Sequence, residues 1–185
     1  MEKEILLNTL NKYQFNFKMK KIILLLLFAF GCSSKQEYKT YFFNEGLFSI
    51  QLPASWSEYD DETDSFSFFD TLLWTGNLRI SPFIDVVPID STKSKEFLMD
   101  RLKDEPTSLM SKIGKFDCAI SKKHFVQDNK NGIIYFWALA KERNLFMCSF
   151  TIAKEREGSK ENDLEIKKVE AILESIKYKN LPSAQ

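Results

Sequence analysis

The sequence predicts an α+β fold in which an antiparallel β-sheet meander is flanked by helices on both faces. Short segments of alternating apolar and polar residues recur between residues 41 and 152, which is typical of strands. One of them, residues 133–140, is apolar on both faces and is therefore expected to be a central strand covered on both sides. Residues 92–103 and 162–177 carry apolar side chains at helical spacing instead.

The first part of the sheet is predicted from alternation and turn residues. Phe48, Ile50 and Leu52 share one face of a strand that Pro53 ends, and a turn at residues 44–46 precedes it. The other strands expected here are residues 41–43, 65–69 (with Phe66 and Phe68 on one side) and 78–84. Pro82 places the far end of the last one at an edge or outside the hydrogen-bonded ladder.

Two loops separate these strands. Residues 58–64 form an acidic loop, and residues 72–77 form a second loop that contains Trp74 and Gly76.

The second part of the chain begins with the helix at residues 92–103, for which Ser91 or Ser94 is the expected cap and Pro106 the stop signal. Strand character resumes at residues 113–121 and 124–126. The turn residues 128–132 then predict a hairpin with 133–140, and a further turn leads into 145–152.

The C-terminal helix is expected over residues 162–177. Asn162 and Glu165 have the spacing of a capping box. The apolar stripe consists of Leu164, Ile166, Val169, Leu173 and Ile176.

The N-terminal region has the pattern of a bacterial lipoprotein signal. Lys20 and Lys21 precede nine apolar residues, which are followed by Gly31 and Cys32. A helix of nine residues spans only about 14 Å, so a transmembrane helix is the weaker interpretation. We therefore expect a signal peptide at residues 19–31, lipidation of Cys32 and a lipidated tether at 32–40. Residues 1–18 are interpreted as a mis-assigned extension, with translation beginning at Met19.

This interpretation predicts a location and a membrane partner. The protein is expected in the bacterial cell envelope, attached to the membrane through the lipid on Cys32. Ser33 carries no acidic inner-membrane retention signal, which favours the outer membrane and leaves the periplasmic or surface face open.

The charge balance argues against nucleic-acid binding. Residues 1–31 hold five lysines and two glutamates, which leaves 21 basic and 24 acidic residues in the mature chain. A net charge of about −3 lacks the concentrated basic surface that nucleic-acid binding needs.

Few residues suggest catalytic or metal chemistry. Cys118 and Cys148 alternate with apolar residues and are expected in the core, although a disulfide between them stays open. His124 has no recognisable partner motif and is expected on a strand surface. The acidic loop could hold calcium, but it lacks the glycine and terminal glutamate of an EF-hand, so no metal or cofactor is predicted.

Three sequence blocks resemble known domains. Gly46-Leu47-Phe48-Ser49-Ile50-Gln51-Leu52-Pro53, followed by Trp56, resembles the opening strand and corner of PsbP-like domains. Such domains are known from a photosystem extrinsic protein, a Ran-binding protein of the Mog type and bacterial lipoproteins. Residues 74–83 and 150–152 are similar to an uncharacterised lipoprotein family of Bacteroides-like bacteria. The resemblance implies a PsbP-like α/β/α sandwich, with one domain at residues 41–180, and binding more than catalysis.

The sequence therefore predicts a non-enzymatic envelope module that binds a protein partner. Trp74 is the candidate contact, because a loop tryptophan either folds back over the sheet edge or serves as a partly exposed anchor. The alternative is a module for a small ligand or cation, bound between the sheet and a helix. A hydrolase acting through unrecognised residues is a weaker hypothesis.

Overall fold

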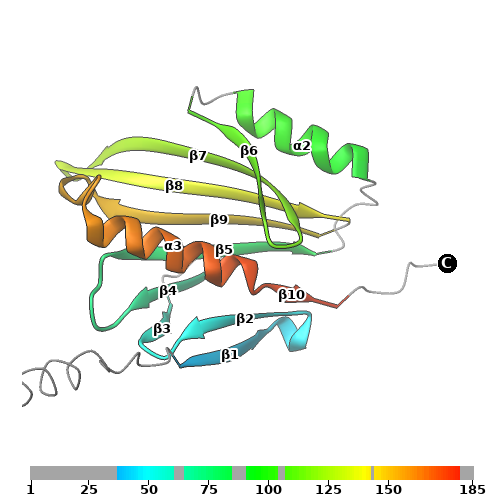
Figure 1. The fold of residues 1–185 in the computed structure, drawn as a ribbon, viewed down its shortest axis with the longest axis horizontal. Coiled ribbons are helices and arrows are strands. Elements are labelled where there is room, and N and C mark those ends of the chain that lie inside the picture. The colour runs from blue at the N-terminus through cyan, green and yellow to red at the C-terminus, as the bar shows by residue number, and fades with distance from the viewer. Residues whose placement is uncertain (1–36, 61–64, 85–90, 104–106, 143, 180–185) are drawn as a thin grey trace, which may run out of the picture. The chain divides into compact units, whose positions relative to one another are not determined.

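The computed structural model describes residues 37–60, 65–84, 91–103, 107–142 and 144–179 (Figure 1). The predicted signal peptide, Cys32 and the first part of the predicted tether lie outside the described residues, as do residues 61–64 of the predicted acidic loop.

The main layer is a seven-stranded antiparallel sheet with strand order β3-β4-β5-β9-β8-β7-β6 (Figure 1). Its strands are β3 (Trp56–Tyr59), β4 (Phe66–Asp70), β5 (Gly76–Ile84), β6 (Leu109–Ile113), β7 (Phe116–Gln127), β8 (Lys130–Lys141) and β9 (Asn144–Ala153). The helices are α2 (Ser91–Lys103) and α3 (Lys160–Glu174), with short 3-10 turns η1 (Asn44–Gly46) and η2 (Lys154–Arg156).

A second, three-stranded sheet contains β1 (Tyr38–Phe43), β2 (Phe48–Pro53) and β10 (Lys177–Tyr178), with β2 in the middle. The sequence pattern predicted the first strands in the same meander as the rest, and it did not predict β10, because a strand of two residues has no periodicity. Strand β1 also begins at Tyr38, three residues before the expected domain boundary and inside the predicted tether.

The two faces of β8 pack into separate parts of the core, because successive side chains of a strand point to opposite faces. Trp137 and its odd-numbered neighbours pack with β2 and with Val169 of α3. Ala138 and Ala140 pack with Leu98 of α2. Strand β8 is central in the sheet, so this prediction is confirmed, as is the predicted antiparallel sheet accompanied by helices.

Turn chemistry explains where the strands begin and end. The β7–β8 hairpin was predicted, and its turn consists of Asp128 and Asn129, whose φ angles of 51° and 60° suit a tight two-residue hairpin turn. The predicted strand at residues 113–121 is interrupted by a turn in which Gly114 has φ 54°, so that β6 and β7 form a hairpin there. Glu58 lies on β3 and not in a loop.

Helix α3 begins earlier than the sequence analysis expected. Its N-cap is Ser159, whose hydroxyl accepts a hydrogen bond of 3.1 Å from the backbone N–H of Asn162. The predicted capping box with Asn162 as N-cap is therefore wrong, because the extended conformation that a cap needs occurs three residues earlier. Leu164 was predicted in the apolar stripe but is 52% exposed, and Ile172 is buried instead.

A buried charged cluster joins α3 to β4. Lys168 Nζ lies 3.1 Å from Glu165 Oε2 and 3.5 Å from Asp70 Oδ2. Both carboxyl side chains are 2% exposed, whereas that of Lys168 is 27% exposed. Burial lowers the pKa of Lys168, but the hydrogen bonds and charges of Glu165 and Asp70 outweigh it and raise the pKa overall. The cation is therefore held between two carboxylates.

Cys118 and Cys148 are buried free thiols, as the core prediction required. Cys118 is paired with Leu139 across β7 and β8, and Cys148 with Trp137 across β8 and β9. One strand therefore separates them, which places their backbones about 10 Å apart, beyond the usual disulfide limit of about 7 Å. Cys118 and Cys148 therefore do not form the disulfide that the sequence left open. Burial raises the pKa of Cys118 to about 12 and also raises that of Cys148.

Both thiols are expected to resist alkylation in the folded protein, because the reactive species is the thiolate. In a Cys32→Ala chain at pH 8, labelling of Cys118 and Cys148 by iodoacetamide should be slower by at least about 100-fold than in denaturant. Peptide mass spectrometry after timed labelling measures both rates. Native labelling at the unfolded rate would contradict the core positions of the two cysteines.

Candidate functional site

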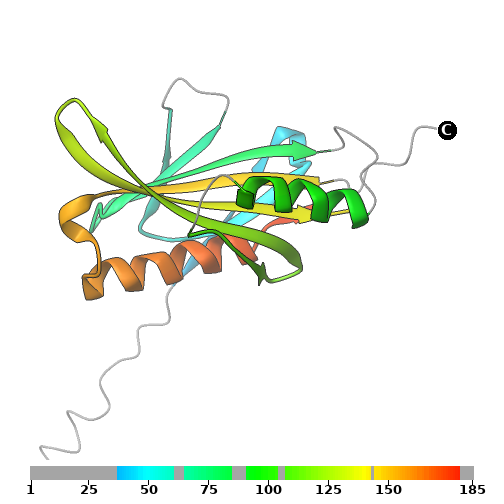
Figure 2. The ribbon, with the colours of Figure 1, turned by 90° about the horizontal axis from the view of Figure 1, so that it is seen from above.

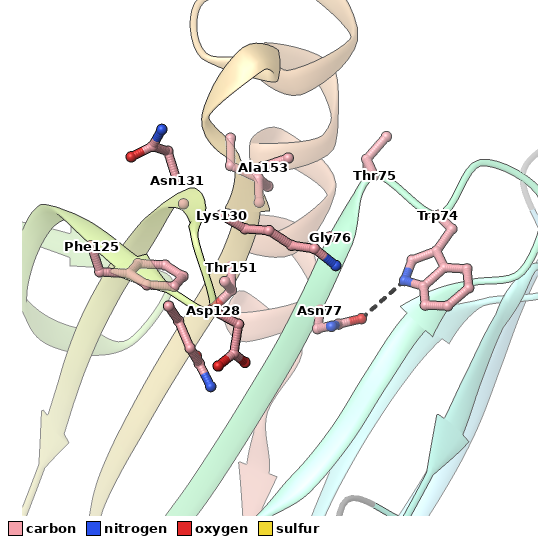
Figure 3. Close-up of a pocket in the computed structure, with 13 residues that line it drawn as sticks. Trp74, Thr75, Gly76, Asn77, Phe125, Asp128, Lys130, Asn131, Thr151 and Ala153 are labelled. Atoms are coloured by element: carbon pink, nitrogen blue, oxygen red, sulfur yellow. Dashed lines mark hydrogen bonds between the residues drawn. The ribbon is translucent and has the colours of Figure 1, made fainter.

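Trp74 lies in the loop that joins β4 to β5 and is 65% exposed. Its indole Nε1 donates a 3.1 Å hydrogen bond to Asn77 Oδ1 (Figure 3), and its backbone N–H donates to the Asp70 carbonyl at 2.8 Å. The ring centroid lies 5.5 Å from that of Phe69. Trp74 is therefore held at the end of the sheet while most of its surface faces solvent.

Phe69 continues this contact into an aromatic row. Its ring centroid lies 5.6 Å from that of Tyr59 on β3, with the planes nearly perpendicular. Such edge-to-face contacts add about 0.5–1.5 kcal/mol beyond the burial of apolar area. The row Tyr59, Phe69 and Trp74 thus lies across β3, β4 and the loop that follows them.

The aromatic row belongs to the face of the large sheet on which α2 packs. This face can be followed along the register from Phe69 to Asn77, then to Thr151 and Ile134. Helix α2 covers only one end of it, at Ala119, Ala138, Ala140, Leu145 and Met147. Figure 2 shows α2 away from the curled tip of the β7–β8 hairpin.

The other end of the face carries exposed or half-buried side chains from five strands. We call it the open face, and it consists of Tyr59, Phe69, Asn77, Arg79, Ile134, Phe136, Ser149 and Thr151, with Trp74 at its rim. Besides Trp74, the open face carries three aromatic rings, one guanidinium group, one amide, one isoleucine and three hydroxyls, of which one belongs to Tyr59. Aromatic residues and arginine are the types that protein interfaces prefer.

A hollow of about 340 Å³ lies at the rim of the open face, between Trp74 and the β7–β8 hairpin. Lys130 extends across it toward Gly76, and Asp128 also lines it (Figure 3). The Phe125 ring covers Gly132, where an added Cβ would lie 2.3 Å from the ring. The glycine therefore allows the ring to lie flat against the strand beside the hollow.

The sequence pattern identifies Trp74 but not the rest of the open face. Alternation predicts which residues share a face of a sheet, and it does not predict how much of that face a helix covers. Phe69 and Arg79 give a partial indication of this exposed surface. Phe69 is an aromatic residue, and Arg79 a cationic one, on the polar side of its strand.

His124 is exposed on β7, as predicted, and lies on the opposite face from the open face. Its Nε2 is 3.3 Å from Glu157 Oε1, and Lys122 Nζ is 2.8 Å from the same oxygen. The hydrogen bond from Lys122 is the main cause that lowers the pKa of Glu157, with a further contribution from His124. No motif in the sequence reveals this partner of His124, because Glu157 is 33 residues away.

The acidic residues do not form a metal centre within the described part of the chain. Among those residues, no group of three or more His, Cys, Asp or Glu side chains is arranged to hold a metal ion. Glu58 and Asp60 are described, whereas the other acidic residues of the predicted loop are not. In the same described ranges, no helix combines the length and apolar character needed to cross a bilayer.

The family model for a domain of unknown function, DUF3805, matches residues 36–182. The chain belongs to the DUF3805 family. The match covers the whole DUF3805 domain described above, from β1 to β10. No curated protein matches the chain.

Solved structures similar to this DUF3805 domain include a protein from Bacteroides thetaiotaomicron VPI-5482. The two are 29% identical with a TM-score of 0.61, over 76% of this chain and 48% of that one. The chain thus spans about half the length of the Bacteroides protein, whose likeness agrees with the predicted resemblance to a Bacteroides-type family.

Two distant structures are also similar. Cyanobacterial PsbP (CyanoP) from Synechocystis is 10% identical with a TM-score of 0.43, over 80% of this chain and 98% of that one. The Saccharomyces cerevisiae Ran-binding protein Mog1p is 6% identical with a TM-score of 0.48, over 78% of this chain and 96% of that one. Both belong to the group that the sequence analysis named, and neither likeness bears on function.

Proposed function

We propose that this protein is a lipid-anchored, non-enzymatic module of the bacterial cell envelope that binds a protein partner through its open face. The open face is the observation that carries the proposal. A sheet face with three partly exposed aromatic residues and an arginine, beside an exposed tryptophan, is unusual on a surface that contacts only water.

The anchor is proposed from the sequence. Cys32 would carry the lipid. The residue after it is Ser33 and not an acidic residue, which favours the outer membrane. The small net charge of the mature chain argues for a protein partner and against a nucleic acid. We also propose that the layers correspond to a PsbP-like α/β/α sandwich, in which the small sheet lies in the same outer layer as α3.

Cross-linking in living cells, followed by purification of the tagged protein and mass spectrometry, tests this function. One envelope protein should be recovered with the natural chain and lost with Cys32→Ala. The variants Tyr59→Ala, Arg79→Ala and Trp74→Ala should each lower its recovery, by about tenfold for a residue at the centre of an interface.

Matched controls separate the open face from general surface effects. Tyr38→Ala on β1 and Arg156→Ala on η2 remove the same residue types from exposed positions elsewhere and should leave recovery unchanged. Equal loss with the controls, or no recovered protein at all, would contradict the proposal. The small-ligand alternative would then be favoured, with a hollow of about 300 Å³ between α2 and the sheet, lined by Arg101 and Phe136, as its site.

A further inference from the structure

The β4–β5 loop presents three consecutive large apolar side chains to solvent. Leu72 is 80% exposed, Leu73 is 60% exposed and Trp74 is 65% exposed. The loop is nevertheless well held, because Leu72 N–H donates to Asp70 Oδ1 at 3.0 Å and Trp74 N–H donates to the Asp70 carbonyl. A fixed loop with an apolar tip is a feature that the fold itself does not need, and such tips commonly contact a partner or a membrane.

This loop lies close to the start of the described domain. The carbonyl of Glu37 accepts a hydrogen bond of 2.8 Å from Ala54 N–H. Ser55 follows Ala54 in the chain. The Ser55 carbonyl accepts two hydrogen bonds from Thr71, one of 2.8 Å from its backbone N–H and one of 2.7 Å from its hydroxyl. Thr71 immediately precedes Leu72. The loop is therefore separated from Glu37 by two strand spacings, or roughly 10 Å.

The proposed lipid attachment site is close to the same point along the chain. Cys32 precedes Glu37 by five residues, which reach at most about 18 Å when fully extended. A domain held to a bilayer through Cys32 therefore keeps the backbone of Thr71 within about 28 Å of the point of lipid attachment. Two leucines insert only weakly by themselves, but a short tether raises their effective concentration at the surface to about the millimolar range.

We infer that the loop forms a second membrane contact, in which Leu72 and Leu73 enter the outer part of the bilayer and Trp74 lies at the level of the headgroups. This inference rests on the lipid anchor of the proposed function. Tryptophan is enriched at that depth because its ring is apolar and its N–H is polar. With both contacts in place, the end of the sheet faces the membrane, and Trp74, at the rim of the open face, borders both the headgroups and a partner bound beside them.

Tryptophan fluorescence tests the inference directly. The chain has three tryptophans, and Trp56 and Trp137 are each 1% exposed, so Trp74 is the one that lipid can reach. The full-length protein, produced with its own signal and purified in detergent, is reconstituted into phosphatidylcholine vesicles with or without brominated acyl chains. We expect a blue shift on reconstitution and loss of emission with brominated lipid, and neither effect in a Trp74→Phe variant.

Variants assign the contact to the loop. The double variant Leu72→Ser/Leu73→Ser should lose the quenching, whereas Met99→Ser, an exposed apolar residue on α2, should keep it. Because the contact is apolar, added salt and anionic lipid should leave quenching unchanged.

The outcomes separate the loop from the anchor. Protein that floats with the vesicles but is not quenched overturns the loop contact and leaves the anchor intact. Protein that does not float overturns both. Unquenched Trp74, together with loss of the cross-linked partner in the double leucine variant, would assign the loop to the protein partner instead.

Discussion

Replacing Phe146 with alanine is expected to lower the free energy of unfolding by about 3–5 kcal/mol. Phe146 lies on β9 of the large sheet and is fully buried. Its ring centroid lies 5.8 Å from Phe48 on β2, 5.6 Å from Phe116 on β7 and 6.4 Å from Tyr178 on β10. The side chain therefore packs the two sheets against each other, and its loss leaves a cavity that rigid strands cannot fill. Urea unfolding followed by circular dichroism measures the change.

Phe42→Ala is the matched control. Phe42 is on β1 of the small sheet and is 73% exposed, so its removal should change the free energy of unfolding by less than about 0.5 kcal/mol. If Phe146→Ala lowers the free energy of unfolding no more than Phe42→Ala does, the two sheets do not share a core at Phe146.

Lys168→Ala is expected to lower the free energy of unfolding by about 3 kcal/mol, because it leaves two buried carboxylates without their cation. Asp70 and Glu165 are each 2% exposed and lie on different elements, so repulsion between them acts directly on the packing of α3 against β4. Lys103→Ala removes a lysine from another i, i+3 pair, with Asp100, in which both side chains are 70% exposed. That control should lose less than about 1 kcal/mol.

The pH dependence of the Lys168 effect has a defined sign. The pKa of Lys168 is higher in the folded protein than its ordinary value, so its contribution is complete below about pH 10 and decreases as pH rises through the folded pKa. The difference between the natural chain and Lys168→Ala should therefore be constant from neutral pH to about pH 10 and shrink above that. A difference that shrinks toward neutral pH would contradict the proposed pairing.

The sequence predicted the strands with strong alternation and the central position of β8. Phe48, Ile50 and Leu52 are all buried, as their spacing indicated. Apolar side chains on both faces of residues 133–140 predicted a strand with neighbours on both sides, which the register confirms. These features are local, because a period of two within one strand is enough to reveal them.

Features that depend on distant contacts were not predicted. The second sheet forms because β10 returns to β2, which no local pattern shows. The cap of α3 is Ser159 rather than Asn162, because several polar residues in that region have suitable side chains and only the backbone conformation chooses between them. The open face was missed for the same reason, since the extent of α2 decides which polar side of the sheet stays uncovered.

Site-specific photo-cross-linking tests the central claim most directly. A photoreactive benzoylphenylalanine would replace Phe136, a half-buried aromatic residue of the open face, or Leu164, which is 52% exposed on α3 on the opposite face. After irradiation of living cells, we expect a covalent adduct with one envelope protein from position 136 and none from position 164. An adduct from position 164 alone, or equal adducts from both positions, would contradict the assignment of the open face as the partner surface.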